Sequence, residues 1–256
     1  MSAAGQQVRR AVAAAAHGSG LLDYYLRNVL EDRALVLMYH RVLDPAAGMT
    51  CSDPGMFVTR NSFAAQLALL SESFTLVTID AIGDWLAGRV TFERPPCALT
   101  FDDGWADNFS VGFPLLQQFG ATATIFLVTG AMGSAEMMSW EQVLEMERAG
   151  IAFGSHTATH AELGRCDAAR IRREVVDSRE VLGERLRRPS RWFCFPKGSY
   201  NAEARAIVSE YYEGAVTVHN GWVSRGDDTY TLRRIGIHDD VSSTQSLFAW
   251  RLARLR

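Results

Sequence analysis

Two adjacent aspartates interrupt an apolar part of the sequence at residues 101–109, FDDGWADNF. Asp102 and Asp103 follow an apolar run, and a glycine and a tryptophan come directly after them. Two neighbouring negative charges are unfavourable in a low-dielectric interior unless a cation or a hydrogen-bond donor compensates them. The pair therefore indicates a site that supplies such a cation or donor.

Two histidines four residues apart, His156 and His160 in GSHTATH, are candidate ligands for a cation. Alone, this spacing in a loop is weak evidence for a metal site and is more typical of surface or hydrogen-bonded histidines. Imidazole together with carboxylate suits zinc or another first-row divalent ion. One aspartate and two histidines also leave coordination positions open, as a catalytic metal site requires. We therefore predict that one aspartate of the pair binds a metal ion and that the other accepts a proton from water.

The elements that would position these residues alternate between short apolar runs and helical patterns. The runs contain β-branched and aromatic residues and are bounded by polar residues, Gly or Pro, which is typical of strands. They comprise residues 34–40, 74–79, 96–101, 121–128, 151–156, 191–196, 214–218 and 232–238. Strands that alternate with helices predict a parallel sheet, and about seven or eight such units predict a barrel.

Four segments between these runs have the apolar spacing of helices. They are residues 62–73 with Ser62 as a cap, 138–150, 167–186 starting at Asp167, and 202–212 after the cap Asn201. Parallel strands place their functional residues at the carboxyl ends. The histidines and aspartates that end four of the runs are therefore expected to converge on one mouth: His40, Asp102, Asp103, His156 and His238.

Composition excludes several other classes of protein. The 256 residues, 48% hydrophobic and 21% charged, suit one large globular α/β domain. The net charge of −3 gives no reason to expect nucleic acid as a partner. Four widely spaced cysteines argue against a disulfide framework or a cysteine zinc site. No segment has the apolar length of a transmembrane helix.

The amino terminus differs from the rest of the chain. Residues 1–33 are predicted to form a helical or mobile extension before a catalytic domain at 34–256. Two arginines precede a short alanine run, which is too short and too weakly apolar for a signal peptide. Residues 21–30, LLDYYLRNVL, are a candidate amphipathic helix that either packs on the barrel or attaches to a membrane surface. We expect a cytoplasmic protein with possible peripheral membrane association through residues 1–30.

Three motifs together resemble the polysaccharide deacetylase family, also called NodB-homology or carbohydrate esterase family 4. They are TFDDG at 100–104, SHTATH at 155–160 and FCFPKGSYN at 193–201. LMYHRV at 37–42 and LRRIGIH at 232–238 resemble the flanking motifs of a bacterial branch that includes deacetylases of poly-N-acetylglucosamine. The resemblance covers roughly residues 34–240. It implies an α/β fold, a distorted (β/α)7–8 barrel of the NodB-homology type, and metal-dependent hydrolysis of an N-acetyl group on a sugar.

The resemblance also implies roles for the residues of these motifs. Asp102 would be the general base, and Asp103, His156 and His160 would hold a divalent metal. Zinc is expected, with cobalt, nickel, manganese or iron as alternatives. The backbone N–H of Lys197 would stabilise the oxyanion.

The resemblance leaves one role open, that of the general acid, and one position departs from the most common family pattern. The general acid is either His40 or His238, and the YHRV motif favours His40. Many members have an arginine that orients the base where this sequence has Cys194. Arg234 resembles the arginine that replaces it in the YHRV branch, and a bidentate contact would hold Asp102 ionised.

The expected partner is an N-acetylated saccharide, either a polymer, a lipid-linked saccharide or a small glycosylated metabolite. Trp105, Tyr200 and Trp222 are candidates for stacking on sugar faces, although such residues are as often part of the core. Lys197 stands where an aromatic residue is common, so the sugar platform is expected to differ. The alternatives are a related amide or formyl hydrolase and a non-catalytic saccharide-binding protein. The intact Asp–Asp–His–His set argues against the last. The oligomeric state is not predicted.

Overall fold

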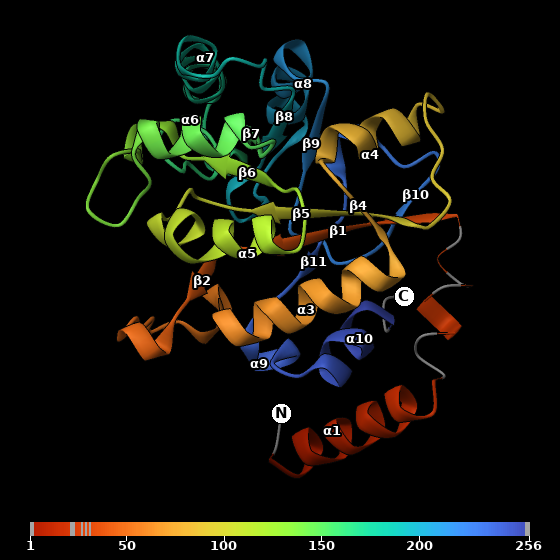
Figure 1. The fold of residues 1–256 in the computed structure, drawn as a ribbon. Coiled ribbons are helices and arrows are strands. Elements are labelled where there is room, and N and C mark those ends of the chain that lie inside the picture. Colours follow the sequence, from red (N-terminus) through yellow and green to blue (C-terminus); the bar gives the residue numbers. More distant parts are fainter. Residues whose placement is uncertain (1–2, 21–23, 27, 29, 31, 254–256) are drawn as a thin grey trace.

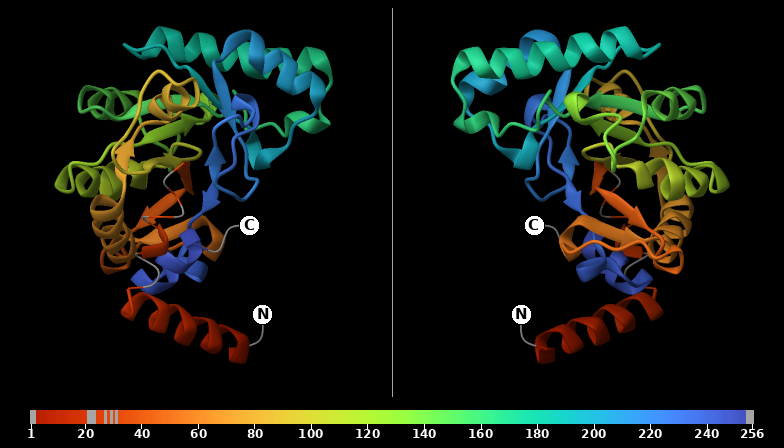
Figure 2. Two further views of the ribbon diagram at one scale, coloured as in Figure 1. Left: turned by 90° about the vertical axis from the view of Figure 1, so that its right-hand side faces the viewer. Right: turned by 90° about the vertical axis from the view of Figure 1, so that its left-hand side faces the viewer.

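A curled sheet of mainly parallel strands, surrounded by helices, forms the centre of the molecule (Figures 1 and 2). The computed structural model describes residues 3–20, 24–26, 28, 30 and 32–253. In the sheet, the strand order is β10-β1-β5-β6-β7-β8-β9, with β4 also paired to β5 and β11 to β1. The strands are β1 (Arg33–Tyr39), β4 (Thr75–Val77), β5 (Pro96–Phe101), β6 (Thr124–Leu127), β7 (Ala152–Ser155), β8 (Trp192–Cys194), β9 (Gly214–Val216), β10 (Val223–Ser224) and β11 (Ile235–Gly236).

The predicted distorted barrel is confirmed. Each of the eight predicted runs contains a strand of the sheet, and every described pairing within it is parallel except that of β10 with β1. The sheet curls toward closure because Val216 pairs with Leu232, and β11 then pairs with β1. The strands differ from the predicted runs mainly in length, since several are only two to four residues long.

Side chains alternate between the two faces of the sheet, as the pleat requires. Val36, Ala98, Phe126 and Cys194 belong to an inner cluster. Neighbouring residues on the same strands, such as Leu37 and Leu99, face the larger outer cluster that the helices cover. Every residue of β5 is buried, as expected for a central parallel strand.

The helices lie outside the sheet (Figure 1). They are α1 (Ala3–Gly18), α3 (Arg60–Ser73), α4 (Ile79–Leu86), α5 (Phe113–Gln118), α6 (Trp140–Arg148), α7 (Ala168–Arg185), α8 (Ala202–Tyr211), α9 (Asp239–Ser242) and α10 (Gln245–Ala253). A separate parallel pair, β2 (Arg41–Leu43) and β3 (Phe57–Thr59), extends from the end of β1. The four predicted helices are confirmed as α3, α6, α7 and α8.

The caps of these helices test the local predictions. Asp167 and Asn201 cap α7 and α8 as expected, each accepting a backbone N–H with its side chain. Ser62 is not the cap of α3. Thr59 caps that helix, and its hydroxyl accepts the N–H of Ser62. Both residue types suit an N-cap, so the sequence alone placed the start of the helix one turn too late.

The amino-terminal helix α1 packs against α10, at the edge of the molecule (Figures 1 and 2). The candidate amphipathic helix at 21–30 falls partly outside the described residues. Of those that are described there, Leu26 and Leu30 are buried in the main core and Tyr24 is exposed. No described helix combines the length and apolar character needed to cross a membrane. The division into an extension and a catalytic domain stays a prediction.

Candidate active site

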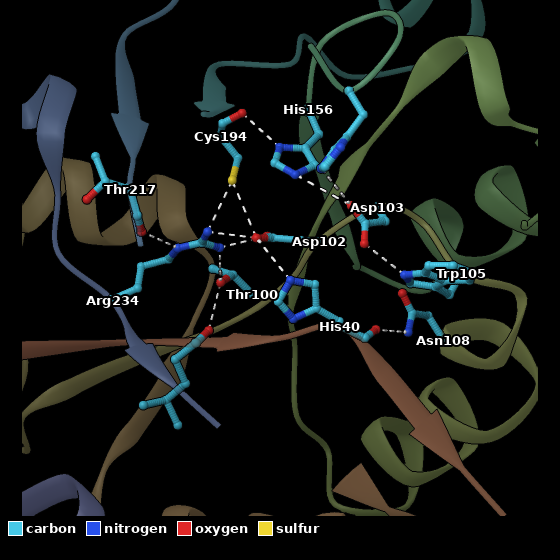
Figure 3. A network of polar contacts seen from close by, with 12 residues as sticks. His40, Thr100, Asp102, Asp103, Trp105, Asn108, His156, Cys194, Thr217 and Arg234 are labelled. Atoms are coloured by element: carbon cyan, nitrogen blue, oxygen red, sulfur yellow. Dashed lines mark hydrogen bonds and ion pairs between the residues drawn. The ribbon is translucent and has the colours of Figure 1, made fainter. Parts of the chain in front are cut away.

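The turn after β5 sends the two aspartates in different directions. Asp102 continues the strand, and its N–H donates to the carbonyl of Tyr39 on β1. Asp103 then adopts a left-handed backbone conformation (φ 77°), and Gly104 follows at φ 88°. The two adjacent carboxylates therefore face different partners, which is how the fold accommodates two neighbouring negative charges (Figure 3).

Asp102 is 2% exposed and forms a bidentate ion pair with Arg234. Both oxygens of Asp102 accept a hydrogen bond from this guanidinium at 2.7 Å. Burial alone would raise the pKa of Asp102, but the charge and hydrogen bonds of Arg234 outweigh it and hold the pKa well below its usual range. The structure thus brings together the two residues that the sequence pairs, and Asp102 is ionised at neutral pH.

Arg234 itself is fully buried, yet each nitrogen of its guanidinium group donates to a hydrogen-bond acceptor. Its Nε donates to the carbonyl of Thr217 at 2.8 Å. Its terminal nitrogens donate to Thr100 Oγ1 at 3.0 Å and to Cys194 Sγ at 3.1 Å, in addition to Asp102. Arg234 has no conformational freedom in this setting, so Asp102 is held in one orientation.

Asp103 lies on the other side, beside the two histidines. Its Oδ1 is 3.5 Å from Nε2 of His156 and 3.4 Å from Nε2 of His160. Its Oδ2 accepts the indole N–H of Trp105 at 2.9 Å. His156 is buried, whereas the side chain of His160 is 36% exposed. The trio is therefore anchored on one side and open to solvent on the other.

The geometry of this trio fits a metal ion. Metal–ligand bonds of about 2.1 Å in tetrahedral geometry place neighbouring ligand atoms roughly 3.4 Å apart. Nδ1 of His156 lies 2.8 Å from the carbonyl of Cys194, so that Nδ1 carries the proton and Nε2 presents a lone pair toward Asp103. Burial also lowers the pKa of His156, which favours the neutral imidazole that a metal requires.

A second group of candidate ligands, Asp102, His156 and Cys194, lies nearby. It fits a metal less well than the Asp103 trio. Both oxygens of Asp102 are already occupied by Arg234. Burial raises the pKa of Cys194 well above its usual value, so the sulfur stays a thiol and not the thiolate that binds metals.

Both candidate general acids lie near this centre. His40 follows β1, and its Nε2 is 4.0 Å from Oδ2 of Asp102 (Figure 3). The carbonyl of His40 accepts a hydrogen bond from Asn108 at 2.7 Å. His238 follows β11, with Nδ1 4.0 Å from Asp240. Burial lowers the pKa of His238, so it is neutral at neutral pH.

The remaining predicted residues do not all reach the site. Lys197 has a left-handed backbone (φ 54°), and its side chain points to Glu162, forming an ion pair at 2.8 Å. Any role in the site would thus fall to its backbone N–H. Tyr200 is half-buried and stacks on Phe195, with ring centroids 4.9 Å apart.

The prediction that Trp222 stacks on a sugar in this site is wrong. Trp222 directly precedes β10, which pairs with the amino end of β1 through Val223 and Ala34. Its indole N–H donates to the carbonyl of Leu252. The site lies at the carboxyl end of β1, whereas Trp222 lies near the amino end of this strand, where it packs against the core.

Trp105 is at the site, but its contacts suggest a different role from the predicted one. Its N–H is used by Asp103, and the guanidinium of Arg41 lies 4.4 Å from its ring. Arg41 is held in turn by Asp107 at 2.8 Å. Asp107 also accepts the N–H of Val42, so this carboxylate fixes the backbone next to His40. Sequence reasoning missed Arg41, Asp107 and Asn108, although Arg41 lies within the quoted YHRV motif and the other two follow FDDGWA.

A barrel that presents a candidate metal-binding trio beside an ionised carboxylate is the arrangement expected of a metal-dependent hydrolase. The family model for polysaccharide deacetylase matches residues 89–212. This part of the chain matches the polysaccharide deacetylase family, and the class of activity is that of an N-deacetylase.

Relatives and solved structures agree with this assignment. The chain is 29% identical over 216 residues to YxkH of Bacillus subtilis, a polysaccharide deacetylase by name, covering 82% of this chain and 73% of that protein. It is 21% identical over 165 residues to a poly-β-1,6-N-acetyl-D-glucosamine N-deacetylase of Staphylococcus aureus, covering 59% of this chain and 57% of the relative. The structure of the Streptococcus pyogenes deacetylase PplD in complex with acetate is similar, with TM-score 0.76, 26% identity, and 85% and 97% of the two chains covered.

Proposed function

We propose that this enzyme hydrolyses the N-acetyl group of an amino sugar within a saccharide, releasing acetate and leaving a free amine. The observation that supports this most directly is the pairing of two adjacent carboxylates with different partners. Asp103 faces two histidine nitrogens at 3.4–3.5 Å, and Asp102 is held ionised by Arg234. Such a pair offers a metal site and a proton acceptor side by side, which amide hydrolysis by water requires.

Asp103, His156 and His160 would hold the divalent ion, and zinc fits their nitrogen and oxygen donors. A bound divalent ion would polarise the acetyl carbonyl and acidify the attacking water. Asp102 would accept one proton of the attacking water. Both of its oxygens accept from Arg234, and Oδ2 also accepts from the thiol of Cys194 at 3.6 Å, so the lone pair that remains for this proton is on Oδ1. The low pKa of Asp102 makes it a weak base, so it acts on a water that is already acidified.

The leaving amine needs a proton when the C–N bond breaks. We assign this proton to His40, because its Nε2 lies 4.0 Å from the carboxylate of Asp102. His238 is disfavoured because burial lowers its pKa. We assign stabilisation of the oxyanion to the backbone N–H of Lys197, which the left-handed turn after β8 presents.

The substrate class we propose is a saccharide that contains β-linked N-acetylglucosamine, in line with the name of the staphylococcal relative. The test is acetate release by the metal-loaded protein. The panel consists of N-acetylglucosamine oligomers, lipid-linked and nucleotide-linked acetamido sugars, and formylated analogues. Release of formate from the formylated analogues, without release of acetate from the other substrates, would mean that the enzyme is a deformylase and not a deacetylase.

The Asp102→Asn variant serves as the control of this assay. It removes the charge that accepts the proton but leaves Asp103 and both histidines in place. We expect turnover to fall by about 10²–10⁴-fold, as for loss of a general base, while the content of bound metal stays at the wild-type level. Near-wild-type turnover would disprove the assignment of Asp102 as the base.

A second pair of variants decides between the two histidines. Because His40 is assigned as the general acid, His40→Gln is expected to lower kcat by roughly 10²–10⁴-fold. His238→Gln is expected to change kcat far less. The measurement is kcat for each variant on the same saccharide. The reverse order of effects would transfer the role of the acid to His238.

A further inference from the structure

The two histidine ligands lie on a loop whose backbone is unfavourable on its own. In this histidine loop (residues 156–160), Thr157 and His160 both have left-handed conformations, at φ 68° and φ 61°. A β-branched residue with positive φ is a true outlier, and such conformations persist only where surrounding contacts impose them. The neighbours of the loop must therefore supply those contacts.

Helix α7 supplies the first contact through Glu174. This carboxylate is only 6% exposed although it belongs to a surface helix. Its Oε2 accepts the backbone N–H of Thr159 at 2.9 Å, and its Oε1 accepts the hydroxyl of Thr159 at 2.6 Å. Hydrogen bonds to an ionised acceptor are stronger than neutral ones. Glu174 thus holds the residue directly before His160.

Ser178 lies one helical turn further along α7, on the same face as Glu174. The N–H of Thr157 donates to Ser155 Oγ at 3.2 Å, and this hydroxyl lies 2.7 Å from Ser178 Oγ. Ser178 donates in turn to the carbonyl of Val175. One helix face therefore holds both sides of the loop, next to Thr157 and next to His160.

A turn at residues 129–131 also binds the loop. The N–H groups of Thr129 and Gly130 donate to the carbonyls of Thr157 and Ala158 at 3.2 and 2.9 Å. A Cβ atom on Gly130 would lie 2.7 Å from the carbonyl oxygen of Ala158, so only glycine allows this approach. The histidine loop is thus fixed between this turn and α7.

We propose that Glu174 is a positioning residue of the metal site, a role that rests on the proposed metal-dependent function. By holding Thr159, it keeps His160 and His156 at 3.4–3.5 Å from Asp103 before the ion arrives. A loop that is already ordered loses no conformational entropy when the ion binds. Outer contacts of this kind commonly tune metal affinity by about 10–100-fold.

A buried carboxylate on a helix can also serve stability alone, so a control is needed. The chain offers a matched control in Glu147 on α6, which is 3% exposed. Its oxygens accept the backbone N–H groups of Arg187 and Arg188 at 2.9–3.1 Å, in a segment that carries no ligand. Glu147→Met and Glu174→Met make the same chemical change, and each leaves backbone donors without their carboxylate. Only Glu174→Met touches the histidine loop.

Two further variants separate the effect of losing the contact between Glu174 and Thr159 from the effect of a folding defect. In Glu174→Gln the amide oxygen can accept the N–H of Thr159 and the amide nitrogen can donate to its hydroxyl, so most of the metal affinity should return. Thr159 is exposed, so Thr159→Val is expected to fold normally while it removes the hydroxyl contact at 2.6 Å. Its metal affinity should fall less than that of Glu174→Met, because the backbone N–H still reaches the carboxylate.

The experiment measures the dissociation constants of Zn²⁺ and Co²⁺ by competition with a chromophoric chelator, together with the visible spectrum of the Co²⁺ form. We expect Glu174→Met to bind about 10–100-fold more weakly than wild type, with an altered Co²⁺ spectrum, and Glu147→Met to bind as wild type does. Equal affinities in both methionine variants, whether both unchanged or both reduced, would overturn the role of Glu174.

If Glu174→Met does not fold, Thr159→Val decides, since wild-type affinity there would also overturn the proposal. The proposed function fails in a different way. A wild-type protein that binds neither ion would refute the metal site itself, and the positioning role with it.

Discussion

The two ends of the barrel differ in the residues that adopt left-handed backbone conformations. At the amino ends of the strands, the left-handed turns that lead into β5, β6 and β7 use Gly88, Gly120 and Gly150. Nothing lies within 4 Å of where a Cβ atom would be at these glycines. Glycine adopts such conformations without a steric penalty, so these turns carry neither strain nor chemistry.

At the carboxyl ends, left-handed positions are filled by residues with side chains as well as by glycines such as Gly104 and Gly198. Among the described residues, the only non-glycine residues with positive φ are Asp103, Thr157, His160 and Lys197. All four follow β5, β7 or β8, at the site. Each such residue costs about 1–3 kcal/mol. The difference teaches that, among the described residues, strained backbone with a side chain gathers at the carboxyl ends, around the candidate metal site.

The carboxyl end also contains the fully buried ion pair, and breaking it should have the largest effect on stability. Arg234→Met leaves Asp102 buried without its counter-charge, which typically costs 3–5 kcal/mol. We expect a loss of about that size in the free energy of unfolding, measured with denaturant on the metal-free protein.

A double mutant sharpens this prediction. When Asp102→Asn is added to Arg234→Met, the uncompensated charge is gone, so part of the lost stability should return. If the two single effects simply add in the double variant, the charges of Asp102 and Arg234 are not coupled, and Arg234 does not hold Asp102 ionised.

Substitution of Trp105, which lies next to the strained turn, tests whether this residue supports metal binding or contacts the sugar. Trp105→Phe removes the N–H that Asp103 accepts at 2.9 Å but keeps an aromatic ring beside Arg41. We expect metal affinity to fall by about tenfold, with little change in KM for the saccharide once the metal is saturating. A raised KM with unchanged metal affinity would instead restore Trp105 as a sugar platform.

Much of the site was predictable because strand ends and motif spacing are local properties. Asp102, Asp103, His156 and His160 follow apolar runs, and parallel strands bring such positions together. The resemblance of the last motif placed Arg234 correctly beside Asp102. These residues needed only the direction and order of the strands.

The contacts that orient these residues were not predictable in the same way. Glu174 lies 14 residues after His160, on a helix face shared with Ile171, Val175 and Leu182. A charged residue on that apolar face was a signal, but its partner Thr159 is defined only once α7 packs on β7. The predicted sugar contact of Trp222 was wrong for a related reason. Strand β10 runs antiparallel to β1, and the residues of β1 with which β10 pairs cannot be predicted from residue type.

The smallest expected effect comes from the amino end, where the turns are relaxed. Gly120→Ala places a Cβ atom in open space but at φ 59°, a conformation that alanine disfavours by roughly 1 kcal/mol. We expect a loss of that size in the free energy of unfolding, with metal affinity and kcat unchanged because the turn into β6 lies at the opposite end of the strands. A change in kcat would show that strain introduced at the amino end reaches the site. The contrast between the relaxed and the strained end of the barrel would then not hold.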